Sequence, residues 1–425
     1  MHPAGLGSPE DRELRLWRHY RYDVAPWLDI CDMTQTFGMA VPRIAAAEAS
    51  EACRAALLEI PAAYLEGEEV GAGAVEQQRE AAGSGGRDAE VVTTPAVVRS
   101  AGEEERGRLL LLPLPDLEGR VLAAMSPVLC AFIRDMPVAW QGLGQGGQPA
   151  DPRVVYLTRH LEGHAADRGV MGAIYWLFVR LCLSAALANA TSVPIRLPPT
   201  EMFAQADPAA TLAERTSSHA HQALLLCAKT LAFCFPEDES SVQAAAGPPV
   251  VETWRTLVDE LDAWHASRPG DFEPMVDMDH AQQQAGSPPS TSTSSHPFPT
   301  ILFATGAAVL ANQLYHTAML LLLSRKPRSW RMAHPLPASL AAGSTAQSPL
   351  WHAQRACGIA LNNDRRDCWD PCLVASLLVA ARGMTHEEQQ AAVLSGLARI
   401  ADVTRWRLAG VVEELKREWD VADMA

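Results

Sequence analysis

Two long apolar segments limit what this chain can fold into. They are residues 170–190 (VMGAIYWLFVRLCLSAALANA) and residues 301–323 (ILFATGAAVLANQLYHTAMLLLL). Each is long enough to cross a bilayer as a helix. Arg180, however, stands in the middle of the first, and a charge at the bilayer centre costs about 2.5–3.5 kcal/mol on insertion scales. Polar side chains interrupt the second segment: Asn312, Gln313 and His316. We therefore expect two buried central helices and no membrane span.

Several helix boundaries can be predicted from local patterns. A Ser or Asp followed by proline is typical of an N-cap and first helical position. This pattern occurs at Ser126-Pro127, Asp151-Pro152, Ser348-Pro349 and Asp370-Pro371. Thr385 and Glu388 have the spacing of a capping box. Basic residues followed by a proline at 325–327 predict the end of the second apolar helix.

Helical periodicity outweighs strand patterns along the whole chain. Near the C-terminus, apolar residues at spacings of three and four predict one stripe on an exposed helix: Leu408, Val411, Val412, Leu415 and Trp419. Alternating β-branched residues are nearly absent, and residues 91–94 (VVTT) are the best strand candidate. We expect an all-α fold, a large helical array or bundle.

Polar low-complexity insertions interrupt this helical body. Residues 66–107 are rich in glycine and glutamate, with ten acidic and three basic residues from Glu66 to Glu105. Residues 277–299 are rich in proline, serine and glutamine, and residues 237–249 and 335–348 are similar but shorter. Such segments bury too little apolar surface to offset the entropy of ordering, so we expect disordered loops.

Charge and cysteine usage narrow the class of protein. The 425 residues include 35 Lys and Arg against 50 Asp and Glu, which gives a net charge of −15. A chain this acidic does not bind DNA phosphates over its whole surface. The chain has an odd number of cysteines, nine, and most of them fall in apolar runs. No two of them have the C-x-x-C spacing. We expect buried thiols in a reducing compartment.

Motifs that would indicate catalysis or nucleotide binding lack their context. Residues 142–147 match G-x-G-x-x-G, but the flanking residues predict neither the strand before it nor the helix after it. His386-Glu387-Glu388 is not followed by the second histidine of a zinc protease motif. The chain contains no Walker A loop and no nucleophile elbow. We interpret residues 142–147 as a glycine-rich loop.

Metal-ligating residues occur only in pairs, whereas zinc needs three or four ligands together. The pairs are His160 with His164, His219 with His221, and Cys368 with Cys372. His316 lies in an apolar run and is interpreted as a core histidine with a hydrogen bond inside the bundle. We therefore predict no catalytic, cofactor-binding or metal site.

Charged clusters look local and solvated. Glu387-Glu388 is explained by capping, and the other acidic pairs lie in polar runs. Basic clusters that could touch nucleic acid are Arg325, Lys326, Arg328 and Arg331, and the pair Arg365-Arg366. A helix C-terminus explains the first cluster equally well.

Four long segments resemble the fungal-specific regulatory domain of binuclear zinc cluster transcription factors. They are residues 19–47 (HYRYDVAPWLDICDMTQTFGMAVPRIAAA), 169–195 (GVMGAIYWLFVRLCLSAALANATSVPI), 300–328 (TILFATGAAVLANQLYHTAMLLLLSRKPR) and 348–420, which begins SPLWHAQRACGIALNNDRRDCWDP. The resemblance covers residues 12–425, with the low-complexity insertions unaligned.

This resemblance implies an all-helical regulatory domain in the nucleus, not an enzyme. It would control RNA polymerase II transcription through contacts with the transcription machinery or other regulators, with effector sensing and homodimerisation left open. The family's DNA reader, a six-cysteine module that holds two zinc ions, has no counterpart in this chain. Zinc and direct DNA binding are therefore not carried over, and DNA would be reached only indirectly.

The residues alone also allow a second hypothesis. An all-α protein can bind a small molecule, or act as an enzyme, through a pocket between helices. The 11 tryptophans and 13 methionines would suit such a pocket, although core packing explains them more simply. Turnover of a metabolite would favour this alternative.

Overall fold

The two long apolar segments form central helices of the protein, α9 (Val170–Asn189) and α15 (Gly306–Ser324). The computed structural model describes residues 9–47, 51–65, 117–144, 151–204, 210–236, 248–278, 297–327 and 348–423. Both helices have the length and hydropathy of a membrane span, but 89% of the apolar window of α9 and 83% of that of α15 are buried inside the folded chain. The prediction of buried central helices is confirmed.

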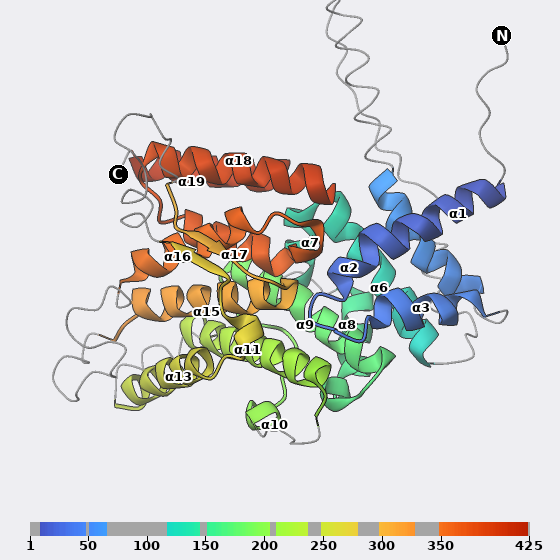
Figure 1. Ribbon diagram of the computed structural model, residues 1–425, viewed down its shortest axis with the longest axis horizontal. Coiled ribbons are helices and arrows are strands. Elements are labelled where there is room, and N and C mark those ends of the chain that lie inside the picture. Colours follow the sequence, from blue (N-terminus) through green and yellow to red (C-terminus); the bar gives the residue numbers. More distant parts are fainter. Residues whose placement is uncertain are drawn as a thin grey trace, which may run out of the picture.

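The other helices lie around α9 and α15 in the view of Figure 1. The chain before α9 contains α1 (Pro9–His19), the π-helix η1 (Tyr20–Val24), α2 (Ala25–Leu28), α3 (Thr36–Ala46), a helix over residues 51–65, α6 (Leu117–Arg134), α7 (Met136–Leu143), α8 (Pro152–Leu161) and the 3-10 turn η2 (His164–Ala166). Between α9 and α15 lie α10 (Glu201–Ala204), α11 (Leu212–Cys234), α13 (Pro248–Ala266) and η3 (Gly270–Phe272). After α15 come α16 (Pro349–Asn362), η7 (Arg366–Cys368), α17 (Pro371–Ala381), α18 (Glu387–Thr404) and α19 (Ala409–Asp423).

The core helices pack in two groups that share α17. Helix α9 packs mainly against α17 and α7, and α15 packs against α11, α16 and α17. The buried side chains of both groups belong to one continuous hydrophobic cluster. The fold is all-α, as predicted.

One short antiparallel ribbon is the described exception to helix. Strand β1 (Val276–Met278) pairs with β2 (Thr300–Leu302), so that Asp277 lies opposite Ile301. The expectation that the second apolar segment is helical from residue 301 is therefore wrong at its start. Thr305 ends the extended stretch because its hydroxyl accepts the Ala308 N–H and caps α15.

Most of the predicted insertions lie outside the described residues. This applies to all of 66–107, including the strand candidate at 91–94, and to most of 237–249, 277–299 and 335–348. The expectation of disordered loops is wrong at the edges that are described: residues 248–249 begin α13, residues 277–278 belong to β1, and Ser348 is the N-cap of α16. Residues 297–299 belong to no helix or strand, but Phe298 is buried in the core.

The capping predictions are partly correct. Asp151 and Asp370 cap α8 and α17, each accepting the N–H two residues ahead. Ser348 precedes α16, but its side chain makes no capping bond. Ser126-Pro127 does not start a helix. It lies inside α6, where burial of the apolar residues on both sides outweighs the effect of proline, and the Ser126 hydroxyl donates to the carbonyl of Ala56.

The capping box predicted at Thr385 and Glu388 is also wrong. Helix α18 begins at Glu387 with His386 as its N-cap, which places the third helical position at Gln389. A capping box is found at Thr211 and Glu214 instead, at the start of α11. The predicted apolar stripe on the last helix is confirmed within α19, where the side chains of Val411, Leu415 and Trp419 are buried and that of Val412 is half-buried, whereas Leu408 is buried directly before the helix begins.

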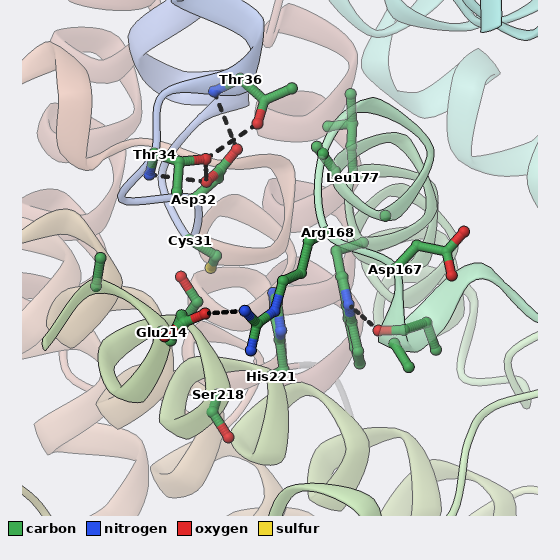
Figure 2. A pocket seen from close by; sticks show the side chains of 18 of the residues that line it. Cys31, Asp32, Thr34, Thr36, Asp167, Arg168, Leu177, Glu214, Ser218 and His221 are labelled. Carbon is green, nitrogen blue, oxygen red and sulfur yellow. Dashed lines mark hydrogen bonds and ion pairs between the residues drawn. The ribbon is translucent and has the colours of Figure 1, made fainter. Parts of the chain in front are cut away.

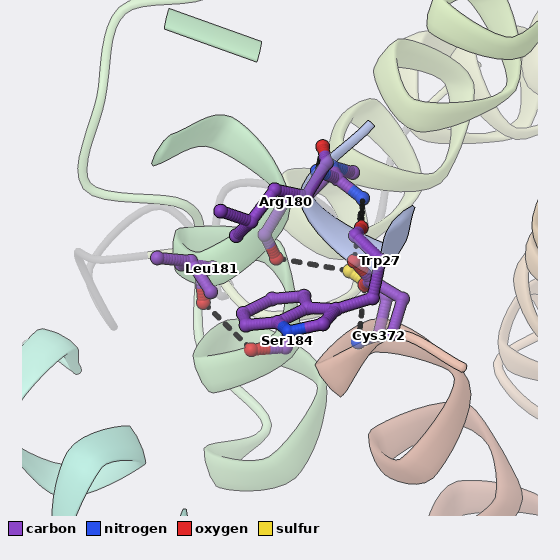
Figure 3. A network of polar contacts seen from close by, with 7 residues as sticks. Trp27, Arg180, Leu181, Ser184 and Cys372 are labelled. Carbon is purple, nitrogen blue, oxygen red and sulfur yellow. Dashed lines mark hydrogen bonds and ion pairs between the residues drawn. The ribbon is translucent and has the colours of Figure 1, made fainter. Parts of the chain in front are cut away.

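A buried ion pair joins three parts of the chain (Figure 3). The Arg180 guanidinium on α9 donates through Nη1 to Asp370 Oδ2 at 2.7 Å and to the Trp27 carbonyl at 3.2 Å, and through Nη2 to the Leu28 carbonyl at 2.5 Å. The side chains of Arg180 and Asp370 are 2% and 0% exposed. Asp370 also caps α17, and the Cys372 thiol donates to the Arg180 carbonyl. One cation therefore stabilises the end of α2 and the start of α17 together.

We predict that Asp370→Ala destabilises the protein by about 3–5 kcal/mol, because it leaves the Arg180 charge buried without its counter-ion. Urea unfolding followed by circular dichroism measures the change in unfolding free energy.

Asp151→Ala is the matched control, since Asp151 is also an N-cap before proline but is bonded only at the surface end of α8. It should cost about 0.5–2 kcal/mol, the ordinary effect of losing a cap. Equal losses in the two variants would contradict the role of the ion pair.

Candidate functional site

A cavity of about 280 Å³ lies beside Arg180, between the loop after α2, the start of α9, α10 and the start of α11 (Figure 2). The apolar part of its lining comes from Leu28, Cys31, Ala165, Ala166, Gly172, Ala173, Trp176, Leu177, Phe203 and Ala213. The polar part comes from Asp32, Thr34, Thr36, Asp167, Arg168, Arg180, Glu214, Ser217, Ser218 and His221. This surface, the Trp176 pocket, combines an aromatic and aliphatic wall with an equal number of polar and charged side chains.

Three rings form the aromatic wall of the pocket. The Trp176 indole stacks on the His221 imidazole, with centroids 3.8 Å apart and planes within 6°. Phe203 lies edgewise to both rings, at 5.4 Å from Trp176 and 6.1 Å from His221. The Trp176 Nε1–H donates to the Ala165 carbonyl at 3.1 Å, which fixes the indole. The wall is therefore set by α9, α10 and α11 together.

Two glycines allow the chain to reach this wall. Gly169, the N-cap of α9, has φ +104°, a conformation that side chains with a Cβ rarely adopt. At Gly172, a Cβ atom would stand 2.0 Å from the Asp167 carbonyl oxygen. The segment before α9 can therefore lie directly against the helix and complete the side of the pocket.

The rim formed by the loop after α2 is held by its own hydrogen bonds. Asp32 Oδ1 accepts the Thr34 N–H at 2.9 Å and Oδ2 accepts the Thr36 N–H at 3.0 Å. The Thr34 hydroxyl also donates to Asp32. This carboxylate therefore shapes the loop.

An ion pair crosses the mouth of the pocket, as Figure 2 shows. Arg168 Nη1 lies 2.9 Å from Glu214 Oε1, and the Arg168 side chain is 82% exposed. Glu214 is positioned by the capping box, in which Oε2 accepts from the Thr211 N–H and hydroxyl. These hydrogen bonds, with Arg168, lower the pKa of Glu214 and keep it ionised.

Two titratable groups of the pocket, His221 and Cys31, are neutral. Burial, with the nearby Arg180 charge, lowers the pKa of His221 to about 3, although Asp32 acts in the opposite direction. Burial raises the pKa of Cys31 to about 12, so the thiol keeps its proton. A histidine this acidic is a weak base, and a protonated thiol is a weak nucleophile. The groups in the pocket are suited to binding a ligand.

Arg180 also has an unpaired donor, which is itself buried. Its Nη atoms bond to Trp27, Leu28 and Asp370, whereas its buried Nε has no hydrogen-bond partner in the protein. An unpaired buried donor is unfavourable and uncommon in folded proteins.

The histidine pairs singled out in the sequence are separated in the structure. His160 bonds to the Tyr156 carbonyl and His164 to Asp167. His219 and His221 leave α11 in different directions, so that His219 stacks on Trp264 and His221 on Trp176. No group of three or more His, Cys, Asp or Glu side chains within the described residues is placed to hold a metal ion.

The cysteine and core histidine predictions can be compared directly with the structure. All nine cysteines lie in described residues as buried thiols, as expected. Cys368 lies in η7, and Cys372 is the second residue of α17, beside Arg180. The prediction for His316 is confirmed, since it is 3% exposed and its Nδ1 lies 2.9 Å from His352 Nδ1.

The remaining sequence candidates have structural roles where they are described. Gly142 lies in α7 and Gly144 is its C-cap, so a helix precedes the glycine-rich stretch, whose last three residues lie outside the described chain. Arg325 donates to the Cys234 carbonyl, Arg365 pairs with Asp367, and Arg366 pairs with Asp23 at 2.6 Å. Lys326 lies over the Trp254 ring, whereas Arg328 and Arg331 are outside the described residues.

The Trp176 pocket itself was missed by sequence reasoning. In the sequence, His221 stands out only as a neighbour of His219, and Trp176 only as part of an apolar helix. A glycine at residue 169 before a helix and a tryptophan within it are weak signals, because core packing produces the same pattern. The lining comes from segments up to about two hundred residues apart, which no local motif connects.

No family model, no curated protein and no solved structure matches the chain.

Four buried or half-buried histidines predict loss of stability in acid. Burial lowers the pKa of His219 to about 4 and those of His221 and His265 to about 3, and it lowers that of His316 well below 6.5. The unfolded chain therefore binds more protons than the folded chain below about pH 6.5, and the free energy of unfolding falls as pH falls. Asp29 opposes this, because burial raises its pKa to about 7, but it is one group against four. Thermal unfolding between pH 7 and pH 4 measures the trend.

His219→Phe should make this pH dependence shallower, because phenylalanine keeps the stacking on Trp264 and removes a ring whose Nε2 has no partner. His386→Phe, at an exposed position, is the control. A slope unchanged by His219→Phe would contradict the assignment.

Proposed function

We propose that this chain is the regulatory domain of a fungal transcription factor of the binuclear zinc cluster type, and that the Trp176 pocket is its effector site. It would act in the nucleus and control RNA polymerase II transcription through contacts with the transcription machinery or other regulators. One such partner would be a second copy of the chain, so that the domain acts as a homodimer. The domain would be a binding module and not an enzyme, and it would need neither zinc nor another cofactor of its own.

The observation that carries the proposal is the pocket between helices. Two of the four segments that resemble the family line it: residues 19–47 supply the rim, and residues 169–195 supply Trp176 and Arg180. A third segment, which contains α17, is tied to the pocket through the Arg180–Asp370 pair. A ligand bound there would contact a residue that holds distant parts of the fold together.

The second candidate, a small-molecule-binding protein or enzyme outside transcription, is favoured by the same pocket. The fate of the bound ligand distinguishes the two candidates. A change in transcription with no chemical change in the ligand supports regulation, whereas turnover supports an enzyme.

A reporter assay tests the proposal. The full chain, fused to a heterologous DNA-binding domain in a fungal host, should change transcription from a promoter carrying the matching site, and a fluorescent fusion of the unmodified chain should accumulate in the nucleus. The DNA-binding domain alone is the control. The purified chain should show no tight, sequence-specific band in a gel shift at moderate salt, since its net charge is −15.

An unchanged reporter would contradict the proposal, as would tight specific DNA binding by the chain alone. Consumption of a metabolite by the purified protein would favour the enzyme.

A further inference from the structure

We infer that the Trp176 pocket binds a small aromatic amine as its cation, with the ring against the aromatic wall and the ammonium group at the carboxylates of the mouth. This inference deepens the proposed function, on which it rests, by giving the chemical class of the effector.

The aromatic wall accounts for the ring of the ligand. Trp176, which stacks on His221 at 3.8 Å, and Phe203, which lies edgewise at 5.4 Å, both line the cavity. Aromatic pairs prefer offset or edge-to-face contact, and a ligand ring can adopt either against such a wall. A volume of about 280 Å³ lies at the low end of ligand pockets and limits the ligand to a small ring system.

The charged side chains of the lining do not cancel one another. They are Asp32, Asp167, Glu214, Arg168 and Arg180. Arg180 is neutralised by Asp370, which lies 2.7 Å away and is not part of the lining. The three carboxylates of the lining therefore have one remaining cation among them, the Arg168 guanidinium.

The partners of Asp32 and Asp167 do not remove this surplus of negative charge. Asp32 accepts hydrogen bonds from uncharged donors, the N–H and hydroxyl of Thr34 and the N–H of Thr36. Asp167 lies 2.6 Å from the His164 imidazole, which is charged only when it is protonated. Hydrogen bonds from uncharged donors stabilise a carboxylate without cancelling its charge. With His164 neutral, the pocket carries two more negative charges than positive ones, so it attracts a cation and repels an anion.

The position of Arg180 decides which end of the pocket receives the ammonium group. Burial and the Arg180 charge lower the pKa of His221, and the opposing effect of Asp32 is smaller, so the imidazole end disfavours a cation. The ammonium group would therefore lie between the loop after α2 and the start of α11. Asp32 and Glu214 lie there on either side of Cys31 in the view of Figure 2. The uncharged ring would lie against the aromatic wall.

The protein already places a cation of its own at this carboxylate. The Arg168 Nη1 lies 2.9 Å from Glu214 Oε1, but the Arg168 side chain is 82% exposed. An ion pair this exposed contributes little, because water screens it and a long side chain must be held in one conformation. A ligand ammonium group can therefore replace the guanidinium at Glu214, and Arg168 would then turn into the solvent.

Four small probes test the ligand class on the purified full chain by isothermal titration calorimetry at neutral pH. 2-Phenylethylamine is a cation with a ring, 2-phenylethanol is neutral, 3-phenylpropanoate is an anion, and 2-cyclohexylethylamine keeps the charge without a flat ring. 2-Phenylethylamine should bind most tightly. Replacing its ammonium group by a hydroxyl should weaken binding about tenfold or more, the effect of one hydrogen bond to a charged group. The anion should bind more weakly still, and the cyclohexyl amine more weakly than 2-phenylethylamine.

Asp32→Asn tests the role of the carboxylate. It should weaken 2-phenylethylamine about tenfold through the lost attraction and leave 2-phenylethanol unchanged, which damage to the loop would not do. Asp259→Asn is the matched control, since it removes the same charge from an exposed position on α13 outside the pocket. It should leave both probes unchanged.

Arg168→Gln gives a change in the opposite direction. It removes the competing guanidinium, so 2-phenylethylamine should bind about twofold to fivefold more tightly, as expected for loss of an exposed ion pair. A gain in affinity cannot result from a damaged fold. This variant therefore keeps the inference testable should Asp32→Asn fail to fold, as judged by circular dichroism.

Phe203→Ala and Met202→Ala locate the ring of the ligand. Both residues lie on α10, but Phe203 lines the pocket, whereas Met202 is 47% exposed and does not. Phe203→Ala should weaken 2-phenylethylamine and 2-phenylethanol alike, by about threefold to tenfold. Met202→Ala should leave both unchanged.

The outcomes separate this inference from the proposed function. Binding of 2-phenylethanol or 3-phenylpropanoate as tight as that of the amine would overturn the ligand class and leave the regulatory role untouched. Amine binding unaffected by Asp32→Asn, Arg168→Gln and Phe203→Ala would overturn the site in the same way. No binding by any probe, with the reporter responding, would overturn the ligand class alone. Selective binding of 2-phenylethylamine with an unresponsive reporter would support the ligand class and overturn the transcriptional role.

Discussion

The structure depends on the buried cation of Arg180. Arg180 lies in the middle of an otherwise apolar helix, and transferring its charge from water is strongly unfavourable unless the protein replaces the lost hydrogen bonds. The replacements come from Asp370, 190 residues away along the chain, and from the carbonyls of Trp27 and Leu28, about 150 residues away in the other direction. Because these partners are the ends of α2 and α17, the core can close only when three distant segments meet in one arrangement. The packing of Leu, Val and Ala side chains alone would tolerate several arrangements. The polar contacts of Arg180 restrict the core to one of them.

The same residue connects the core with the Trp176 pocket. The Nη side of the guanidinium is committed to the fold, and the residue also lines the pocket, whose wall is built two turns or less away on α9. The aromatic wall and the buried pair therefore share one rigid helix, and α9 is held from its other side by α7, where the Trp140 Nε1–H donates to Ser184. A pocket on such a support is largely preformed, which lowers the entropy lost when a ligand binds.

Sequence patterns predicted what depends on local chemistry. Helical periodicity gave the all-α class, and the polar interruptions at Arg180 and His316 correctly indicated burial within the chain. Boundaries failed where tertiary packing decided them: Pro127 lies inside α6 because both flanks are buried, and residues 300–302 pair as a strand with a segment 22 to 26 residues earlier. The pocket could not be predicted, because Trp176, Phe203 and His221 become one site only after α9, α10 and α11 are packed. Arg180 was recognised as an obstacle to a membrane span, but its partners could not be read from spacing.

An effector can act only if it binds two states of the protein with different affinity. The Arg180 network is a poor element to switch, since movement would break the bonds to Asp370, Trp27 and Leu28 together and expose a desolvated charge. The ion pair at the mouth of the pocket is easier to break. Arg168 is mostly exposed, so its ion pair with Glu214 is screened by water and weak. Opening this pair would free the entrance without disturbing the core, and a bound ligand would favour one position of Arg168 over another. The Arg180 side of the pocket is therefore fixed, whereas the Arg168 side can move. A change at Arg168 would be passed on to the start of α11, where Glu214 belongs to the capping box.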